Sequence, residues 1–429
     1  MPGFASLPGF RDFYPEELRT RSHIMAAWRE AARRFGFEEY DGPPLEPLEL
    51  YVEKSGEEIV RQLYAFTDKG GREVSLRPEM TPTLARMVGA RARGLRKPVR
   101  WFSVPQLFRY ERTQRGRLRE HFQWNVDIVG EDDVSADAEV LAVALEALRL
   151  LGLTDADLVA RVNDRRLLER LLLHAGVPAD QLGTVYAVID KLGREGEERI
   201  RERLGSEAGL GPGTLDALFD ILSQRDIPAL ADRFAGVPGI FDELDRLSRY
   251  FDALGELGLS SFVAYDASIV RGLAYYTGIV FEIFDRAGEL RAVCGGGRYD
   301  HLLEQVSGES LPALGFGMGD VVLAELLAER GLLPDTAAHV DDYLVAISEA
   351  QRPVVRRLAA ELRRQGRSAL YTLRVAGVGR QFKDAAAAGA ARTIVVGPEE
   401  VEAGVAVVKD MASGEERRMP LADLAGEEP

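Results

Sequence analysis

The segment FRYERTQRGRLREHFQ, residues 108–123, concentrates positive charge in an acidic protein. It holds five arginines and two acids, whereas the 429-residue chain has a formal net charge of −15. Five more basic residues lie just before it, between Arg91 and Arg100. Because clustered guanidinium groups repel one another, the segment predicts an anion among them. The location of the positive charge, not the net charge of the chain, decides whether a polyanion can bind.

The same segment predicts the loop of a β-hairpin. Residues 100–130 have the pattern of a strand, a basic loop and a second strand. Alternate side chains of a strand lie on one face of the sheet. Three pairs are therefore expected to share a face: Arg109 with Glu111, Arg117 with Arg119, and Gln123 with Asp127. The predicted surface has cations at its loop end and an amide and a carboxylate deeper in the sheet.

The chemistry of this surface leaves two interpretations open. Arginine side chains bind phosphate oxygens in pairs, so a polyphosphate fits the cluster. The loop from Thr113 to Gly116 is then placed to meet a nucleic-acid backbone. Alternatively, the hairpin is a solvated charged surface on which Glu111 and Glu120 pair with the arginines. The segment by itself favours neither interpretation.

Three other stretches place polar residues beside apolar strands. RPEMT puts Glu79 and Thr81 at the start of a helix, where Thr81 could also be a simple cap. RGLAYYTG, which begins at Arg271, holds two tyrosines between apolar strands, and such a pair usually serves core packing. VCGGGRYD, which begins at Val293, has three glycines that let a backbone approach a flat ligand or simply form a turn. Each signal is weak when it stands alone.

The strand and helix patterns divide the chain into domains. Residues 1–326 predict an α+β domain around an antiparallel sheet, with a leucine-rich helical insertion at about 165–258. A linker is expected at 327–340. Residues 341–429 alternate apolar strands with helices, which is typical of a small α/β domain.

The composition argues against several classes of protein. Hydrophobic residues make up 46% of the chain and charged residues 29%, as in ordinary globular proteins. The single cysteine, Cys294, cannot form an internal disulfide, and the five scattered histidines predict no metal site. No apolar run is long enough to cross a bilayer, and the first residues lack the pattern of a signal peptide. We therefore expect a cytoplasmic protein with no membrane partner.

Taken together, the segments resemble those of the histidyl-tRNA synthetases, a family of class II aminoacyl-tRNA synthetases, over essentially the whole chain. PGFRDFYPEE resembles the family's N-terminal signature, GFEEYDGPPLE its motif 1 and FRYERTQRGRLREHFQ its motif 2. RGLAYYTGIVFE and AVCGGGRYDHL resemble two histidine-specific signatures. LAAELRRQG, GRQFKDAAAAGA and VAVVKD resemble the anticodon-binding domain. The resemblance implies a class II catalytic domain with an antiparallel sheet, followed by an anticodon-binding-type α/β domain.

The resemblance also implies a role for each residue that falls on a family motif. Catalysis would rest on Arg109 and Arg271, which would hold the α-phosphate of ATP from two sides. Histidine would be bound by Glu79, Thr81, Arg109, Gln123, Asp127, Arg271, Tyr275 and Tyr276. ATP would be bound by Arg109, Glu111, Arg117 and Arg119. The acceptor end of the tRNA would meet Arg112 and Gln114. None of these residues is expected to be a metal ligand.

The implied activity is that of a histidine–tRNA ligase. L-histidine would be activated by ATP to histidyl-adenylate and pyrophosphate, and the histidyl group would pass to tRNA(His). Mg²⁺ is expected to accompany ATP, and the motif 1 resemblance implies a homodimer. The activation step needs no general base, because the histidine carboxylate is already ionised at neutral pH. Positioning and electrostatics would then supply most of the catalysis.

The chain departs from the family pattern at two places. Motif 3 of class II enzymes ends in an arginine that clamps the nucleotide, but ALGFGMGDVVL has Val322 at that position and Asp320 nearby. A valine cannot bind phosphate, and an aspartate is expected to repel it. Ala274 stands where many relatives carry an acid. Arg298 or an arginine of the motif 2 loop is a candidate replacement for the missing cation.

These departures leave an alternative function open. The chain could be a non-catalytic, histidine-binding paralogue, such as the regulatory subunit of ATP phosphoribosyltransferase. Two features favour the ligase: the chain keeps Arg271 and the motif 2 arginines, and it keeps a domain of the anticodon-binding type, which that paralogue usually lacks.

Overall fold

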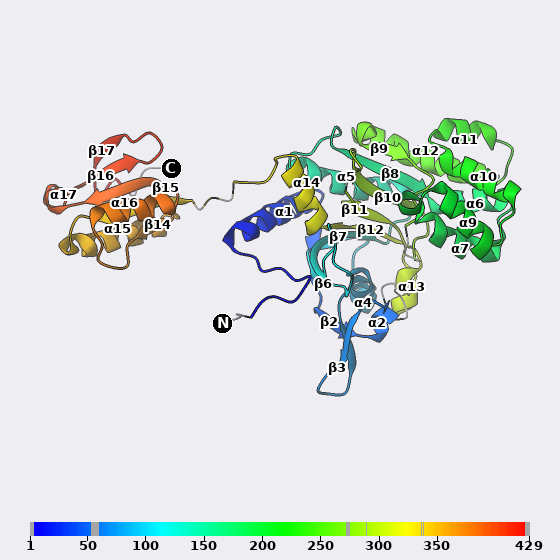
Figure 1. Ribbon diagram of the computed structural model, residues 1–429, viewed down its shortest axis with the longest axis horizontal. Helices are drawn as coiled ribbons and strands as arrows, with labels where there is room; N and C mark the ends of the chain where they lie inside the picture. Colours follow the sequence, from blue (N-terminus) through cyan, green and yellow to red (C-terminus); the bar gives the residue numbers. More distant parts are fainter. Residues whose placement is uncertain are drawn as a thin grey trace. The chain divides into compact units, whose positions relative to one another are not determined.

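The chain folds into two compact units, which are described separately below (Figure 1). The computed structural model describes residues 4–52, 60–271, 275–288, 290–335, 337 and 339–424. The units are Met1–Pro334 and Asp335–Pro429. The domain boundary predicted at residue 326 falls inside helix α14 (Asp320–Glu329), and the first unit extends to Pro334. The helix continues because Leu326 and Leu327 are buried in the core of the first unit.

The first unit is built on one large sheet, which in the described part of the chain has nine strands. The strand order is β1-β5-β7-β12-β11-β10-β8-β9, and β6 pairs with β7 beside this path. Only the end pairs, β1–β5 and β8–β9, are parallel, so the predicted antiparallel sheet is confirmed. The strands are β1 (Glu38–Glu39), β5 (Val99–Ser103), β6 (Gln106–Phe108), β7 (Glu120–Val129), β8 (Leu158–Asp164), β9 (Val263–Tyr265), β10 (Ile279–Asp285), β11 (Cys294–Arg298) and β12 (Ala313–Gly319).

Helices α1 (Pro15–Arg34), α5 (Val134–Leu150) and α14 pack around the centre of this sheet. Trp28 of α1 stacks on Trp124 of β7 with ring centroids 6.1 Å apart, and its Nε1 donates to Met318 Sδ at 3.3 Å. These buried aromatic contacts tie the first helix to the strands that carry the polar residues of motif 2. The cap of α5 is Asp133, whose side chain accepts from Ser135 N at 2.9 Å.

A smaller layer lies beside β6 and β7 (Figure 1). Its sheet has the order β2-β4-β3 and is antiparallel. The helix predicted to start at RPEMT is present as α4, and Glu79 lies in the loop between β4 and α4. The elements are β2 (Leu45–Pro47), α2 (Glu49–Val52), β3 (Tyr64–Thr67), β4 (Glu73–Leu76), α4 (Thr81–Arg91) and α13 (Leu302–Ser307).

Helices interrupt the first unit between β8 and β9, in the green part of Figure 1. Their inward leucines, such as Leu171, Leu218 and Leu247, are buried, which explains why this stretch of the sequence is leucine-rich. The elements are α6 (Arg165–His174), η1 (Ala179–Gln181), α7 (Leu182–Ile189), α8 (Leu192–Glu195), α9 (Glu197–Glu207), α10 (Pro212–Ser223), α11 (Ile227–Arg233), α12 (Ile240–Glu256) and η2 (Ser260–Phe262).

The second unit has its own sheet, in the order β14-β13-β15-β16-β17. The first three of these strands are parallel and the rest antiparallel. The buried Asp342 pairs with Arg367 at 2.7 Å. The elements are β13 (Val340–Ala346), η3 (Glu349–Gln351), α15 (Arg352–Arg364), β14 (Ala369–Tyr371), α16 (Val378–Ala387), β15 (Ala390–Val396), α17 (Pro398–Ala403), β16 (Val405–Asp410) and β17 (Glu416–Pro420).

Candidate active site

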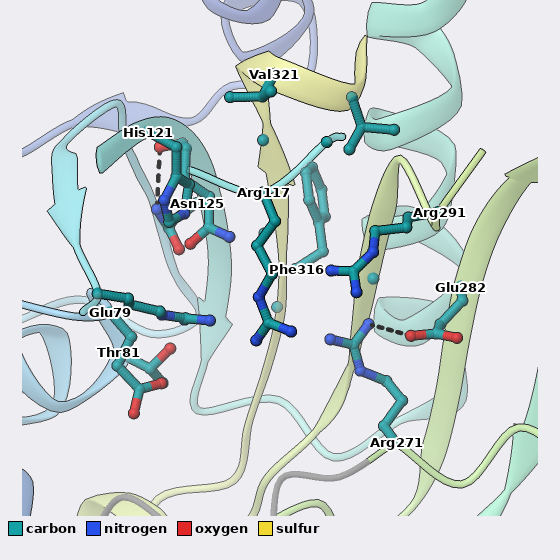
Figure 2. Close-up of a pocket in the computed structure, with 18 of the residues that line it drawn as sticks. Glu79, Thr81, Arg117, His121, Asn125, Arg271, Glu282, Arg291, Phe316 and Val321 are labelled. Carbon is teal, nitrogen blue, oxygen red and sulfur yellow. Dashed lines mark hydrogen bonds and ion pairs between the residues drawn. The ribbon is translucent and has the colours of Figure 1, made fainter. Parts of the chain in front are cut away.

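A pocket of about 390 Å³ opens over the middle of the large sheet (Figure 2). Its lining comes from β7, β11 and β12, from the loop before α4, from the motif 2 loop and from the start of α14. Two ends differ in chemistry. The carboxylate end comprises Glu79, Thr81, Asp127, Tyr275 and Tyr276. The arginine end comprises Arg117, Arg271 and Arg291.

Glycines of the sheet make room for the side chains of the pocket. A Cβ atom on Gly317 would lie 2.7 Å from Gln123 Nε2, and one on Gly315 would overlap Asp127. A Cβ atom on Gly295 would overlap the guanidinium of Arg271. The Gly-rich stretches of the sequence therefore allow close approach, as predicted, but the groups that approach are the protein's own polar side chains. The floor of the pocket is a polar layer lying flat on the strands.

The carboxylate end is held together by tyrosines. Tyr275 Oη donates to Glu79 Oε2 at 3.2 Å, and Tyr299 Oη donates to Asp127 Oδ1. The ring of Tyr275 lies 5.1 Å from that of Tyr276 and 5.8 Å from that of Tyr299. Each acid thus has a neutral hydroxyl partner in a packed aromatic group. The positions of the two carboxylates are thus fixed by hydrogen bonds from tyrosine hydroxyl groups, which are neutral.

Asp127 lies at the bottom of this end and is 4% exposed. Burial raises the pKa of its carboxyl group to about 7, although the hydrogen bond from Tyr299 opposes the shift. A carboxylate in such a place gains most from a ligand that brings a polar N–H or a positive charge. The sequence paired Asp127 with Gln123 on one face, and both line the pocket.

Arg271 reaches the pocket from an unusual backbone conformation. Its φ is +52°, in the left-handed region that non-glycine residues rarely adopt. The guanidinium lies 5.4 Å from the ring centre of Tyr276, donates to Phe281 O at 3.3 Å and lies 3.7 Å from Glu282 Oε1 (Figure 2). Strained conformations of this kind gather at functional sites, where the surroundings hold them.

The motif 2 residues separate into two groups. Arg109, Glu111 and Arg117 line the pocket. Arg109 Nε donates to Pro78 O at 2.9 Å, next to Glu79, while Arg117 forms an ion pair with Glu111. The predicted anionic ligand would therefore have to compete with Glu111 for this guanidinium.

Arg119, predicted to share a face with Arg117, points elsewhere, which corrects that prediction. Its guanidinium lies 4.2 Å from the ring centre of Tyr110, and its Nε donates to Glu111 O at 3.1 Å. It does not line the pocket. The strict alternation of a strand fails here because β7 begins only at Glu120, so residues 117 and 119 lie in the loop. Arg112 and Gln114 are exposed at the tip of this loop, outside the pocket.

The tip of the loop is attached to helix α14. Arg115 Nε lies 3.3 Å from Glu325 Oε2 and also pairs with Glu329, and Gly116 N donates to Glu325 Oε1 at 3.1 Å. Helix α14 is where the motif 3 arginine was expected. In this chain the helix carries acids that hold the arginine-rich loop by ion pairs.

Asp320 does not act as the expected repulsive charge. It accepts from Phe122 N at 3.0 Å and pairs with Arg11 Nη1 at 2.9 Å, and Arg11 Nε also lies 2.6 Å from Glu120. Arg11 belongs to the N-terminal signature PGFRDFYPEE. This signature thus anchors the start of β7 to the start of α14, and Asp320 is neutralised by it.

The prediction that Arg298 could replace the missing motif 3 cation is wrong. Its side chain is buried under the sheet, with Nε donating to Asp137 Oδ2 at 3.1 Å and Nη1 to Glu131 O at 3.0 Å. It does not line the pocket. Ala274, the second departure from the family pattern, lies outside the described residues.

Several residues that line the pocket were not among those predicted from the motifs. They include His121, Asn125, Lys191, Glu282 and Arg291. Asn125 lies between Gln123 and Asp127 at alternate positions of β7, so the alternation rule could have found it. Arg291 lies three residues before β11 begins, so alternation could not have placed it. Burial and nearby arginines lower the pKa of His121 to about 3, so this ring is neutral. Lys191 comes from the helical insertion and could not be placed without the fold.

The fold is that of a class II aminoacyl-tRNA synthetase. A histidyl-tRNA synthetase from Nostoc sp. PCC 7120 has the same fold, with a TM-score of 0.83, 24% identity and 99% of both chains covered. A protein described as an ATP phosphoribosyltransferase regulatory subunit/histidyl-tRNA synthetase, from Bacillus halodurans C, has a TM-score of 0.74 at 25% identity. That match covers 89% of this chain and 96% of the other. The predicted class II fold is confirmed.

Sequence comparison defines the family. The family model described as histidyl-tRNA synthetase matches residues 9–320, and the anticodon binding domain model matches residues 342–427. The histidine–tRNA ligase of Opitutus terrae is 42% identical over 422 residues, which are 98% of this chain and 97% of that protein. The chain belongs to the histidyl-tRNA synthetase family, as its motifs predicted.

Proposed function

We propose that the protein activates L-histidine with ATP, giving histidyl-adenylate and pyrophosphate, and transfers the histidyl group to tRNA(His). As a member of an aminoacyl-tRNA synthetase family it is a ligase. The observation that carries the proposal is the pocket with two chemically different ends. A carboxylate end suits the ammonium and imidazole of histidine, and an arginine end suits a triphosphate.

At the carboxylate end, Asp127 would accept an imidazole N–H and Glu79 would pair with the α-ammonium group. Gln123, Thr81 and the two tyrosines would supply neutral hydrogen bonds. The buried position of Asp127 supports this assignment, because a hydrogen bond to a group without competing water discriminates strongly between ligands. An amino acid that lacks the ring N–H would leave this carboxylate unpaired.

Between the two ends of the pocket, the histidine carboxylate would attack the α-phosphorus of ATP. A bond forms between a carboxylate oxygen and phosphorus, and the bond from phosphorus to the bridging oxygen breaks, so that pyrophosphate leaves with the electron pair. Arg109 and Arg271 would neutralise the charge on the equatorial oxygens. A hydroxyl oxygen of the terminal ribose of the tRNA would then form an ester bond to the carbonyl carbon. The bond from that carbon to the phosphate oxygen would break, and AMP would leave with the electron pair while a phosphate oxygen takes up the hydroxyl proton.

Further partners belong to the same proposal. Mg²⁺ would arrive with ATP, bound to the phosphates that leave as pyrophosphate. The exposed Arg112 and Gln114 would meet the tRNA acceptor end, and the second unit would bind the anticodon. The protein would form a homodimer through motif 1, whose strand β1 lies at an end of the sheet. It would work in the cytoplasm. In the described residues no helix is long and apolar enough to span a membrane.

Histidine-dependent exchange between ATP and pyrophosphate tests the first half-reaction. We expect exchange with histidine and none without it. Arg271→Ala should lower the exchange rate by a factor on the order of 10²–10³, as for other charge-stabilising groups. Arg271→Lys keeps the charge but not the two-pronged geometry, and we expect a smaller loss. Histidine binding without any exchange would instead identify the regulatory paralogue and overturn the ligase proposal.

A further inference from the structure

We infer that Arg291 supplies the cation that Val322 leaves out, and that it binds the outer phosphates of ATP from the end of β11. The inference rests on the proposed function and names the part of the substrate that this residue holds. Arg291 lies in the turn-side extension of β11, three residues before Cys294. Arg291 lies outside both the glycine-rich stretch AVCGGGRYDHL and motif 3, so the family motifs give it no role.

The side chains of Arg291 and Val322 both lie next to Gly116 of the motif 2 loop. A Cβ atom built on Gly116, in the motif 2 loop, would lie 3.2 Å from Val322 Cγ2 and 3.8 Å from Arg291 Cδ. The strand register agrees with this proximity. Cys294 pairs with Met318 in antiparallel β11–β12, so the chain before β11 runs towards the start of α14. An arginine at either position, 291 or 322, therefore enters the same region of the pocket.

The charges around this region would favour a bound phosphate only if a further cation were present. Val321 and Val322 are apolar, and Arg117 is already paired with Glu111. Arg115 is bound to the acids of α14. A triphosphate entering here would meet the Glu111 carboxylate unless further positive charge balanced it. The guanidinium of Arg291 provides that charge.

The position also selects which phosphates are bound. Figure 2 shows Arg117, Arg271 and Arg291 pointing into a common space, with Arg291 on the side away from Glu79 and Thr81. The reacting carboxylate and the α-phosphate belong between the two ends of the pocket, near Arg109 and Arg271. The outer phosphates then extend towards the part of the pocket beside Gly116, near which the side chains of Val322 and Arg291 both lie. Arg291 is thus a substrate-binding residue that makes its contacts before and during the reaction.

Equilibrium binding tests this inference independently of turnover. Titration calorimetry would measure ATP, AMP and histidine binding to the full chain and to Arg291→Ala. Loss of a charged hydrogen-bonding group should weaken ATP binding about tenfold to a hundredfold. AMP, which lacks the outer phosphates, and histidine should bind within about twofold of the unchanged protein, a difference of only about 0.4 kcal/mol.

Two variants make the comparison specific. Arg291→Lys should recover part of the ATP affinity, because an ammonium group keeps the charge but not the fork. Arg286→Ala is the matched control, since it removes an exposed arginine near the other end of the same connection, whose Nη2 donates to Ser261 O at 2.8 Å. It should leave ATP binding unchanged.

Three results would overturn the inference: unchanged ATP binding in Arg291→Ala, equal weakening of ATP and AMP, or an equal effect of Arg286→Ala. Exchange assays on the unchanged protein report separately on the proposed function. A protein that fails to exchange but still loses ATP affinity on Arg291→Ala would refute the ligase proposal and support the assignment of Arg291.

Discussion

The two ends of the pocket are built in different ways. At the carboxylate end, acids lie on regular elements or directly before one, accept hydrogen bonds from tyrosines and occupy space that sheet glycines leave open. At the arginine end, guanidinium groups come from a loop, a strained residue and a strand extension, and two of them, Arg117 and Arg271, lie against acids of the protein itself. One end is fixed by packing, while the other is held by ion pairs.

The difference has a consequence for binding. A site fixed by packing needs little rearrangement, so its affinity depends on whether the ligand completes its hydrogen bonds. A site held by ion pairs must exchange them, as when a phosphate takes Arg117 from Glu111. Substitutions at the carboxylate end should therefore have larger and more selective effects than substitutions in the ion pairs around the loop.

Asp127→Asn should have the largest effect. An asparagine removes the negative charge that would hold the imidazole, so the KM for histidine in exchange should rise about a hundredfold or more. ATP binding, measured by calorimetry, should be retained. A histidine KM within twofold of the unchanged protein would show that the carboxylate end is not the histidine site.

The same substitution should change the pH dependence of stability. Burial raises the folded-state pKa of Asp127 to about 7, above the unfolded value of about 4, so the folded state binds more protons between these values. Asp127 therefore lowers the free energy of unfolding as pH rises from about 4 to about 7. Without ligand, Asp127→Asn should be more stable than the unchanged protein at pH 8 by up to about 4 kcal/mol, and less so at pH 5.5. Parallel pH profiles of Tm for the two proteins would contradict this.

Gly317→Ala should have an intermediate effect. The new methyl group would displace the Gln123 amide, which lies 2.7 Å from the position of its Cβ atom. We expect the KM for histidine to rise about tenfold through loss of one hydrogen-bonding group, with a nearly unchanged Tm. Gly319→Ala is the matched control on the same face of β12, because its Cβ atom would meet His121 only at 3.9 Å. Equal effects of the two substitutions would mean that Gln123 does not contact the substrate.

Arg115→Ala should have the smallest effect. Its side chain is 63% exposed, and exposed ion pairs contribute roughly 0–1 kcal/mol, so Tm should hardly change. The loop tip would lose its attachment to Glu325 and Glu329, and the KM for ATP should rise by no more than about fivefold. A loss comparable to that of Asp127→Asn would mean that this end, too, depends on a fixed geometry.

Local patterns predicted much of this architecture. RPEMT predicted the start of a helix, which the structure has as α4. The face shared by Gln123 and Asp127 followed from alternation on one continuous strand, β7. The same rule failed for Arg117 and Arg119, because both lie in a loop and not in a β-strand. There the Arg119 guanidinium lies over the ring of Tyr110 and donates to Pro8 O of the N-terminal segment.

The sequence by itself determined many of the helices and strands and the polar residues with a strict spacing, because these depend on neighbours a few residues away. Only the tertiary structure decided which polar residues share the pocket. Arg298 lies outside the pocket, where it pairs with Asp137, and Asp320 pairs with Arg11. The pairing of β11 with β12 places Arg291 near Val322. Each of these depends on partners distant in the chain, since long-range pairing sets the location and charge environment of a side chain.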